Sequence, residues 1–193
     1  ATLIAADTVN GNITLTNLNM ADAAVTVSTL TTGTGAIAFV QVQGDLTIQK
    51  AATATGAITI TESGSLTIEE ATTGSGDISA EAIGGSLTVA SASSVTGGSI
   101  SLAAAGGTLT AVAVSAGGDG DVTLATTVSG DVVVDSVMAA GDGITITSIG
   151  AILEAADADP EADLTALSLD LNAVSGIHGG SALETDATEI AAD

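Results

Sequence analysis

Apolar and polar residues alternate in short stretches along most of the chain, and most of these stretches follow a glycine. Between residues 98 and 146, a glycine and a small or acidic residue are repeatedly followed by an apolar, polar, apolar triplet. Alternation with a period of two is typical of a β-strand with one buried face and one solvated face. The pattern therefore predicts many short strands.

Two interleaved series of glycines repeat with a spacing of 20 to 23 residues. They are Gly35, Gly56, Gly76, Gly98, Gly120 and Gly143 in the first series, and Gly44, Gly64, Gly85, Gly107 and Gly130 in the second. Two positions after these glycines the residues are apolar, namely Ile37, Ile58, Ile78, Ile100, Val122 and Ile144, then Leu46, Leu66, Leu87, Leu109 and Val132. An isolated strand could not bury this face, but identical strands stacked coil upon coil would form continuous apolar columns.

The repeat predicts an all-β solenoid of about nine coils with three short strands in each coil. The third strand falls in the longer step between glycines, for example at residues 112–114 or 136–138. We expect one segment over residues 1–193, with irregular first coils at 1–34, a regular body at 35–149 and looser coils at 150–193.

Composition supports a narrow aliphatic interior. The chain is 46% hydrophobic but only 1% aromatic, so its core material is Ile, Val, Leu and Ala. Long helices would not tolerate 24 glycines together with so many Thr and Val residues. The absence of Cys excludes disulfides and thiolate metal sites. No apolar run approaches the roughly 20 residues that a membrane helix needs.

The two ends of the sequence nearly match. Residues 1–7 read ATLIAAD and residues 187–193 read ATEIAAD, identical at six of seven positions. One interpretation is a tandem repeat with a period of 186 residues, in which Ile4 and Ile190 contact each other's units across a junction. The alternative is coincidence in a chain rich in Ala and Thr. Neither end shows an amphipathic capping helix, so a further copy is the natural cap, joined covalently or docked end to end.

Several runs resemble the repeats of filamentous haemagglutinin-type adhesins, which are large secreted bacterial exoproteins. These runs are GNITLTN, GDLTIQ, GSLTIEEATTGSGDISAEAIGGSLTV and DLTALSLDLNAVSGIHGGSALET. The resemblance covers nearly the whole chain and is strongest from residue 35 to 185. It implies a right-handed parallel β-helix, a bacterial surface or extracellular location, and a non-enzymatic structural unit of a long filament or adhesin. The chain departs from the family pattern in lacking the amino-terminal secretion domain and in its near absence of Lys and Arg.

The charge is strongly unbalanced, with 23 acidic residues against one Lys or Arg and a formal net charge of −22. With coils stacked at roughly 4.8 Å, a repeat unit spans about 43 Å and carries one negative charge about every 2 Å, close to the roughly 1.7 Å of duplex DNA. We therefore hypothesise that calcium or magnesium promotes lateral bundling of such rods. The alternative is that the acidic residues keep a long polymer soluble in salty surroundings. The negative sign of the net charge excludes nucleic acids and anionic membranes as partners.

Two acidic stretches are candidate calcium ligands. Asp119 and Asp121 lie in GGDGDV, which approaches the calcium-binding nonapeptide of β-roll proteins but has Val122 where that motif needs Asp. Asp157 and Asp159, followed by Glu161 and Asp163, form a second cluster whose spacing is not that of an EF-hand. A glycine-rich turn and a solvated loop are the alternatives. No other cofactor is expected.

Some parallel β-helices are polysaccharide lyases or hydrolases, so a polysaccharide-acting enzyme or passenger module is the second hypothesis. Such chemistry needs two carboxylates in a defined geometry and often a basic group. The only basic residues in the sequence are Lys50 and His178. Glu69 and Glu70 are adjacent, so in a strand they would point to opposite faces. Lys50 either pairs with a neighbouring acid or is a plain surface lysine. His178 is expected to face solvent.

Ice binding is the third hypothesis, because it uses flat Thr arrays on a β-helix. One column of threonines is expected to stack, comprising Thr47, Thr67, Thr88 and Thr110. The companion column reads Gln49, Glu69, Ala90 and Val112, so no regular two-column array exists. The stacked threonines on the solvated face are then explained by the general preference of β-branched residues for strands.

Overall fold

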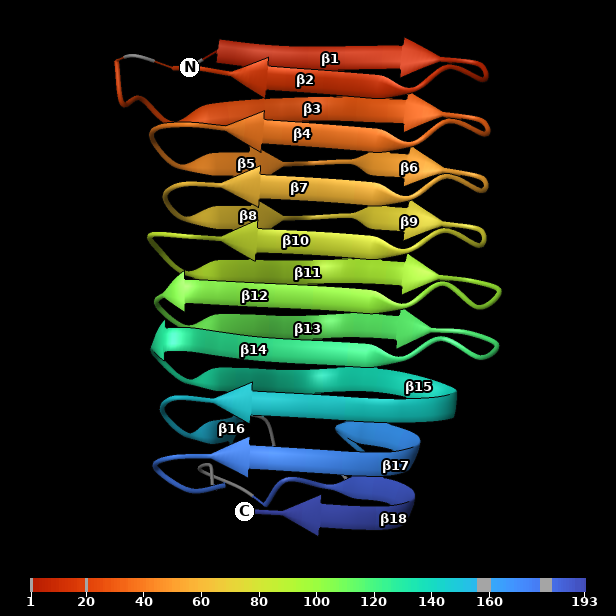
Figure 1. Ribbon diagram of the computed structural model, residues 1–193, viewed down its shortest axis with the longest axis vertical. Helices are drawn as coiled ribbons and strands as arrows, with labels where there is room; N and C mark the ends of the chain where they lie inside the picture. Colours follow the sequence, from red (N-terminus) through yellow and green to blue (C-terminus); the bar gives the residue numbers. More distant parts are fainter. Residues whose placement is uncertain (1, 20, 156–160, 178–181) are drawn as a thin grey trace.

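The chain forms a right-handed parallel β-helix of about eight turns. The computed structural model describes residues 2–19, 21–155, 161–177 and 182–193, and within these ranges it contains 18 strands and no helix. Every strand pairing is parallel. The turns are stacked along one axis, with β1 at one end of the molecule and β18 at the other (Figure 1).

The strands have the following bounds: β1 Thr2–Thr8, β2 Ile13–Asn17, β3 Val25–Thr32, β4 Ile37–Gln41, β5 Leu46–Ile48, β6 Ala51–Thr53, β7 Ile58–Glu62, β8 Leu66–Ile68, β9 Ala71–Thr73, β10 Ile78–Ala82, β11 Leu87–Ser94, β12 Ile100–Gly106, β13 Leu109–Ala116, β14 Val122–Ser129, β15 Val132–Ser148, β16 Ile152–Glu154, β17 Leu164–Ala173 and β18 Thr185–Ala192.

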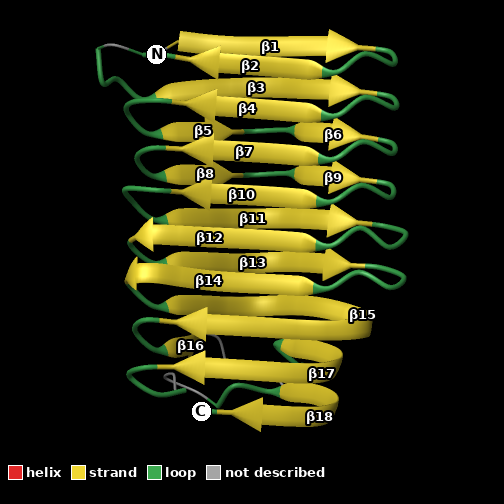
Figure 2. Cartoon of the chain, in the orientation of Figure 1, coloured by secondary structure: helices red, strands yellow, loops and turns green. Residues whose placement is uncertain are grey.

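One turn has three segments, and the turn of β5, β6 and β7 shows them most clearly. We call β5 and its equivalents the first segment, β6 and its equivalents the second, and β7 and its equivalents the third. The first two segments run in one direction and the third runs back (Figure 2). In β11 and β13 the first two segments are fused into one bent strand of eight residues. Three separate strands per turn, as predicted, therefore occur only where a break interrupts this bent strand.

The apolar columns predicted from the glycine spacing are confirmed. In the third segment Ile58 pairs with Ile37 on one side and with Ile78 on the other. In the first segment Leu66 pairs with Leu46 and Leu87 in the same way. All of these side chains are fully buried, and burying one such side chain contributes about 1.5–3 kcal/mol. The predicted third strands lie within β13 and β15, where Val114 pairs with Val137.

The first glycine series stacks at the corner before the third segment. At Gly56 an added Cβ would lie 2.0 Å from the carbonyl oxygen of Gly35, and at Gly76 it would lie 2.0 Å from that of Gly56. The backbones of successive turns therefore approach too closely for any side chain. This contact explains why glycine recurs once per turn at this corner.

The alternation of inward and outward side chains breaks at the bend between the first two segments. In β11 the burial pattern is BiBeiBiB, so Ala90 and Ser91 both point outward. The same break places Glu69 and Glu70 together on the outside, between the buried Ile68 and Ala71. The prediction that Glu69 and Glu70 face opposite sides was wrong, because a bend, unlike a continuous strand, can turn two neighbours outward.

Candidate functional site

Both ends of the solenoid present strand edges. Within the described residues, β1 pairs only with β3, β2 only with β4, and β18 only with β17. Ile4 packs partly buried against the core, whereas Leu3 is 69% exposed and Ile190 is 56% exposed. An unpaired edge of a sheet offers backbone N–H and C=O groups to another strand. The ends are therefore the surfaces best prepared for contact with a further coil.

The heptapeptides that nearly match in sequence occupy different positions in the coil. Ile4 pairs with Val27 in the first segment, whereas Ile190 pairs with Leu169 in the third segment. The two side chains therefore stand at the ends of different apolar columns. A junction between units has to be argued from the strand edges and not from an equivalence of these two residues.

A ladder of buried hydroxyl groups lines the corner beside the stacked glycines. Thr53 Oγ1 donates to the Gly35 carbonyl at 2.9 Å and accepts from the Gly56 N–H at 3.1 Å. The same pair of bonds recurs in neighbouring turns at Thr32, Thr73 and Ser94. We call these four residues the corner hydroxyl ladder. Sequence reasoning missed it, although a hydroxyl residue three or four positions before Gly35, Gly56, Gly76 and Gly98 was a visible signal.

Aspartates at the turns join each coil to the next. Asp45 Oδ1 accepts from the Ser65 N–H at 3.0 Å, and Asp77 Oδ1 accepts from the Ser99 N–H at 2.9 Å. Asp131 Oδ1 accepts from the Ala151 N–H at 2.7 Å. Charge-assisted bonds of this kind are stronger than neutral ones. Part of the acidic composition is therefore explained by structure and needs no ligand.

The predicted calcium ligands Asp119 and Asp121 lie in an exposed turn. Asp121 Oδ1 accepts from the Gly143 N–H of the next coil at 3.1 Å, so it acts as one of these joining aspartates. Asp142 lies beside them, and the negative charge of Asp121 is the main cause that raises the pKa of Asp142. The charges of Asp121 and, to a lesser degree, Asp119 thus act against the charge of Asp142, which is partly exposed. Asp157, Asp159 and His178 lie outside the described residues.

Lys50, the chain's single basic residue other than His178, pairs with an acid of the following turn. Its Nζ lies 3.0 Å from Glu70 Oε1, and both side chains are nearly half exposed. An exposed pair of this kind contributes little to stability. Of the two alternatives left open for Lys50, the structure shows the pairing with a neighbouring acid.

Three carboxylates converge near the end of the solenoid that carries β18. Glu154 and Asp163 are buried and Glu184 is partly buried, and one oxygen from each side chain lies within 4.8 Å of the other two. Asp163 Oδ2 accepts from the Glu184 N–H at 2.8 Å. Burial, and secondarily the charge of Glu154, raise the pKa of Asp163 to about 6. The sequence indicated Asp163 as part of an acidic cluster but could not indicate its partners.

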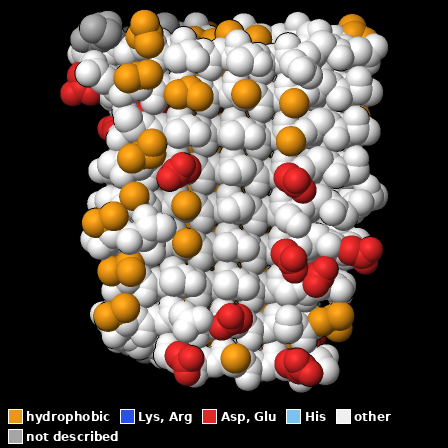
Figure 3. Space-filling view, in the orientation of Figure 1, with side chains coloured by type: hydrophobic (Ala, Val, Ile, Leu, Met, Phe, Trp, Pro, Cys, Tyr) orange, Lys and Arg blue, Asp and Glu red, His pale blue; other side chains and the backbone are white. Residues whose placement is uncertain are grey.

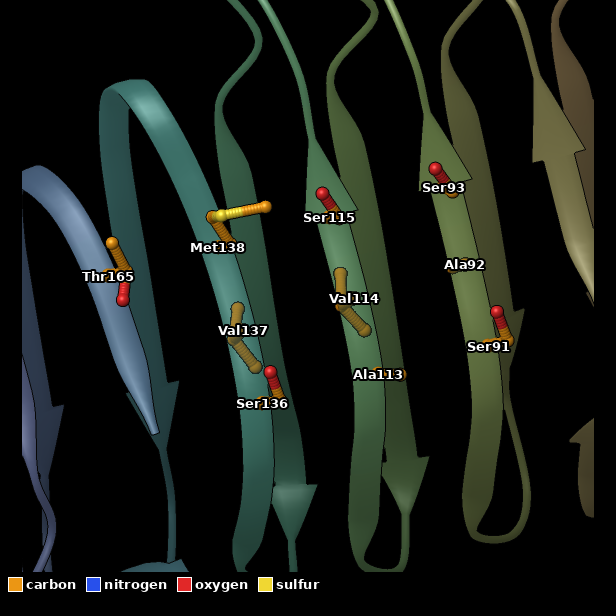
Figure 4. Close-up of a pocket in the computed structure, with 10 residues that line it drawn as sticks. All are labelled: Ser91, Ala92, Ser93, Ala113, Val114, Ser115, Ser136, Val137, Met138 and Thr165. Carbon is orange, nitrogen blue, oxygen red and sulfur yellow. The ribbon is translucent and has the colours of Figure 1, made fainter. Parts of the chain in front are cut away.

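The outer face of the second segments carries a shallow hollow of about 200 Å³ (Figure 4). It is lined by small side chains, including Ser91, Ser93, Ser115 and Ser136, with Met138 at one side. This volume is below the roughly 300–1,000 Å³ of typical ligand pockets. None of its lining residues is a carboxylate or a base, so the hollow offers no acid–base pair.

The predicted threonine column is present on the outer face of the first segments. Thr67 pairs with Thr47 and Thr88, and Thr88 pairs with Thr110. Neighbouring outward positions carry Gln49, Glu69 and Ala90, as the sequence shows. On the face seen in Figure 3, acidic side chains are scattered and no Lys or Arg is visible.

None of the described residues belongs to a helix long and apolar enough to cross a membrane. Comparisons with protein-family models, with curated proteins and with solved structures returned no match for this chain.

Proposed function

We propose that this protein is a non-enzymatic structural segment of a long extracellular bacterial filament or surface adhesin, extended by further coils at its ends. The observation that carries the proposal is the pair of unpaired sheet edges, β1 with β2 at one end and β18 at the other. Each edge repeats the strand geometry that every internal turn uses to bind its neighbour. A second copy of the chain is the occupant that matches this geometry most simply.

The core supports a role as a rod. One hydrophobic cluster runs from Ile13 near the first turn to Leu171 near the last. Parallel ladders join the turns along all three segments, so many backbone hydrogen bonds act together against bending. Elongated proteins with such ladders are suited to set a length or to hold a binding domain away from a surface.

The charge supports an extracellular environment rich in salt or divalent cations. A formal charge of −22 on 193 residues resists random association. The same charge leaves calcium or magnesium as the natural bridge between parallel rods. Ordered stacking at the ends and lateral contacts through cations would then be two independent modes of assembly.

The end-to-end contact can be tested with the full chain and one double variant. Sedimentation equilibrium of the wild type should show species larger than 18.2 kDa that increase with protein concentration. Electron microscopy should show thin rods made of stacked units. Replacing Leu3 and Ile190 by Glu adds like charges to both exposed edges and should abolish this assembly.

Val128→Glu is the matched control, because Val128 is 71% exposed but lies in the body of the solenoid, at the end region of β14. This control should assemble like the wild type. A wild-type chain that remains at 18.2 kDa over the whole concentration range would contradict the stacking of separate chains. Equal loss of assembly in the control would show that added charge, and not edge pairing, controls association.

A further inference from the structure

Glu154 occupies an interior position that is apolar in the preceding turns. It pairs with Val134 at the end of the first-segment column. The earlier members of that column include Val27, Ile48, Ile68, Val89 and Ala111. A carboxylate thus points inward where an aliphatic side chain would fill the core, and only 6% of Glu154 is exposed.

Asp163 and Glu184 bring two further carboxylates to the same place from the adjoining strands. Asp163 immediately precedes β17 and is 3% exposed, and Glu184 immediately precedes β18. The Asp163 N–H donates to the Glu184 carbonyl at 2.9 Å, which holds the two segments side by side. The cluster therefore spans the last two turns of the solenoid.

Within the part of the chain that the structure describes, no basic side chain balances the negative charge of this cluster. The chain contains one Lys or Arg in total, and that residue, Lys50, is bound to Glu70. Burying ionised carboxylates costs several kcal/mol unless they are paired or coordinate a metal. The same cause raises the pKa of Asp163.

An independent observation indicates a missing partner. Glu154 Oε2 is fully buried and has no hydrogen-bond partner among the described residues. Buried polar atoms in native proteins nearly always have a partner in protein, water or an ion. Glu62 Oε2 is the one other atom of this kind in the described part of the chain, but Glu62 does not belong to a group of converging acids.

We infer that Glu154, Asp163 and Glu184 form a binding site for a divalent cation, with calcium as the preferred ion. Calcium binds carboxylate oxygens at about 2.3–2.6 Å, so two oxygens on opposite sides of it are about 4.6–5.2 Å apart. The three oxygens all lie within 4.8 Å of one another, which is compatible with this span. Magnesium demands near-ideal octahedral geometry at about 2.0–2.1 Å and keeps several of its waters, so a cluster of mostly buried carboxylates suits calcium better.

The ion would fasten the final turns to the body of the solenoid. It would link the end of β16 with the starts of β17 and β18, in place of three carboxylates that repel one another. The inference does not depend on the filament proposal, because it concerns the stability of a single chain. Assembly and cation binding can therefore fail separately.

Calorimetric titration of the full chain with calcium chloride, in salt high enough to screen diffuse binding, tests the site. We expect one specific calcium ion per chain and weaker binding of magnesium. Glu154→Gln keeps the shape of the side chain and should weaken calcium binding by about tenfold or more. Glu62→Gln is the matched control, since it alters the other buried glutamate with an unpartnered oxygen and should leave calcium affinity unchanged.

Hydrogen exchange with and without calcium supplies a second readout. Calcium should slow exchange in β17 and β18 of the wild type and leave β5 to β10 unchanged. Without calcium, Glu154→Gln should be at least as stable as the wild type, since a buried charge is removed, so loss of binding cannot be ascribed to unfolding. Equal calcium affinity in wild type and Glu154→Gln, or equal loss in Glu62→Gln, would overturn the inference.

Discussion

Gln41 and Glu62 occupy the same interior position of two successive turns, but only Gln41 has hydrogen-bond partners for both of its terminal side-chain atoms. Gln41 Nε2 donates to the Asp45 carbonyl at 3.1 Å, and its Oε1 accepts from Asn17 Nδ2 at 3.1 Å. Glu62 Oε1 accepts from the Gly64 N–H at 2.8 Å, whereas its Oε2 is buried without a partner. An amide therefore suits this position better than a carboxylate.

Glu62→Gln should stabilise the protein by about 1–3 kcal/mol at neutral pH, since it replaces an unsatisfied buried oxygen by a donor. Burial raises the pKa of Glu62 above its ordinary value of 4.5. The folded state therefore holds the proton more tightly than the unfolded state, and the stability of the wild type falls as pH rises from 4.5 through the raised value. Below 4.5 this penalty is absent, and the advantage of the variant should shrink.

Urea unfolding of wild type and Glu62→Gln across this pH range measures the effect. Glu69→Gln provides the control, because Glu69 is exposed and its replacement should change stability by less than about 0.5 kcal/mol. A variant that is less stable than the wild type at neutral pH would contradict the interpretation.

The corner hydroxyl ladder should be sensitive to loss of a single hydroxyl. Thr73→Val leaves the Gly56 carbonyl and the Gly76 N–H without the bonds that Thr73 Oγ1 now makes at 3.1 and 2.9 Å. We expect a loss of about 1–3 kcal/mol in thermal or urea unfolding. Thr73→Ser should retain most of the stability, as Ser94 does the same task in the next turn. A Thr88→Val change on the outer face should be nearly neutral, and a similar loss there would argue against a special role for the ladder.

The glycine corner should not accept even a methyl group. Gly76→Ala places Cβ about 2.0 Å from the Gly56 carbonyl oxygen, and the turns would have to separate. The expected loss is about 1–3 kcal/mol or more. Gly143→Ala is the comparison, since its Cβ would first meet the side-chain oxygen of Ser168 at 3.0 Å, and that oxygen can rotate away. Equal unfolding midpoints for both variants would refute the contact argument.

The repulsion that Asp121 and Asp119 exert on Asp142 can be measured directly. Asp121→Asn removes the main cause of the raised pKa of Asp142 and should return that pKa toward its ordinary value of 3.8. Asp119→Asn should have a smaller effect, because Asp119 is the weaker contributor. Carbon-detected NMR titration of the carboxyl groups gives both values. An unchanged pKa in Asp121→Asn would show that the two carboxylates do not interact in solution.

Lateral bundling of rods through divalent cations can be tested separately from cation binding at the buried site. Light scattering should rise when calcium or magnesium is added and fall again with a chelator or with high sodium chloride. Because bundling uses the whole charged surface, Glu154→Gln should bundle like the wild type. If scattering does not respond to the chelator, bundling through divalent cations is contradicted, and the acidic surface serves solubility alone.

The columns of the core were predictable because glycine and apolar residues recur at nearly constant spacing from Ile37 to Ile146. The bend at Ala90 and Ser91 was not predictable, because alternation with a period of two assumes an unbroken strand. The sequence predicted about nine coils and the structure has about eight, because the number of residues per coil increases toward the C-terminus. Val137, for example, pairs with Leu164, 27 residues further on.

The acidic cluster was only partly visible in the sequence for the same reason. Asp163 stood out in an acidic run, but Glu154 stands nine positions before it in the sequence and Glu184 belongs to the next turn. Their meeting depends on the register between β17 and β18, which pairs Leu164 with Thr185. Local spacing carries no information about such a register once the repeat becomes irregular.

The corner hydroxyl ladder stops at Ser94, because its column continues with Ala116 and Ala139. From Thr126 to Ser148, buried hydroxyls appear instead at the opposite corner, where Thr126 Oγ1 donates to the Gly130 carbonyl at 3.0 Å and Ser148 Oγ to the Ala151 carbonyl at 2.8 Å. The buried hydroxyls thus change from one corner of the coil to the other between Ser94 and Thr126. Parallel backbone ladders run through all three segments in both halves, so they share tension along the axis, and the buried hydroxyls reinforce a different corner in each half.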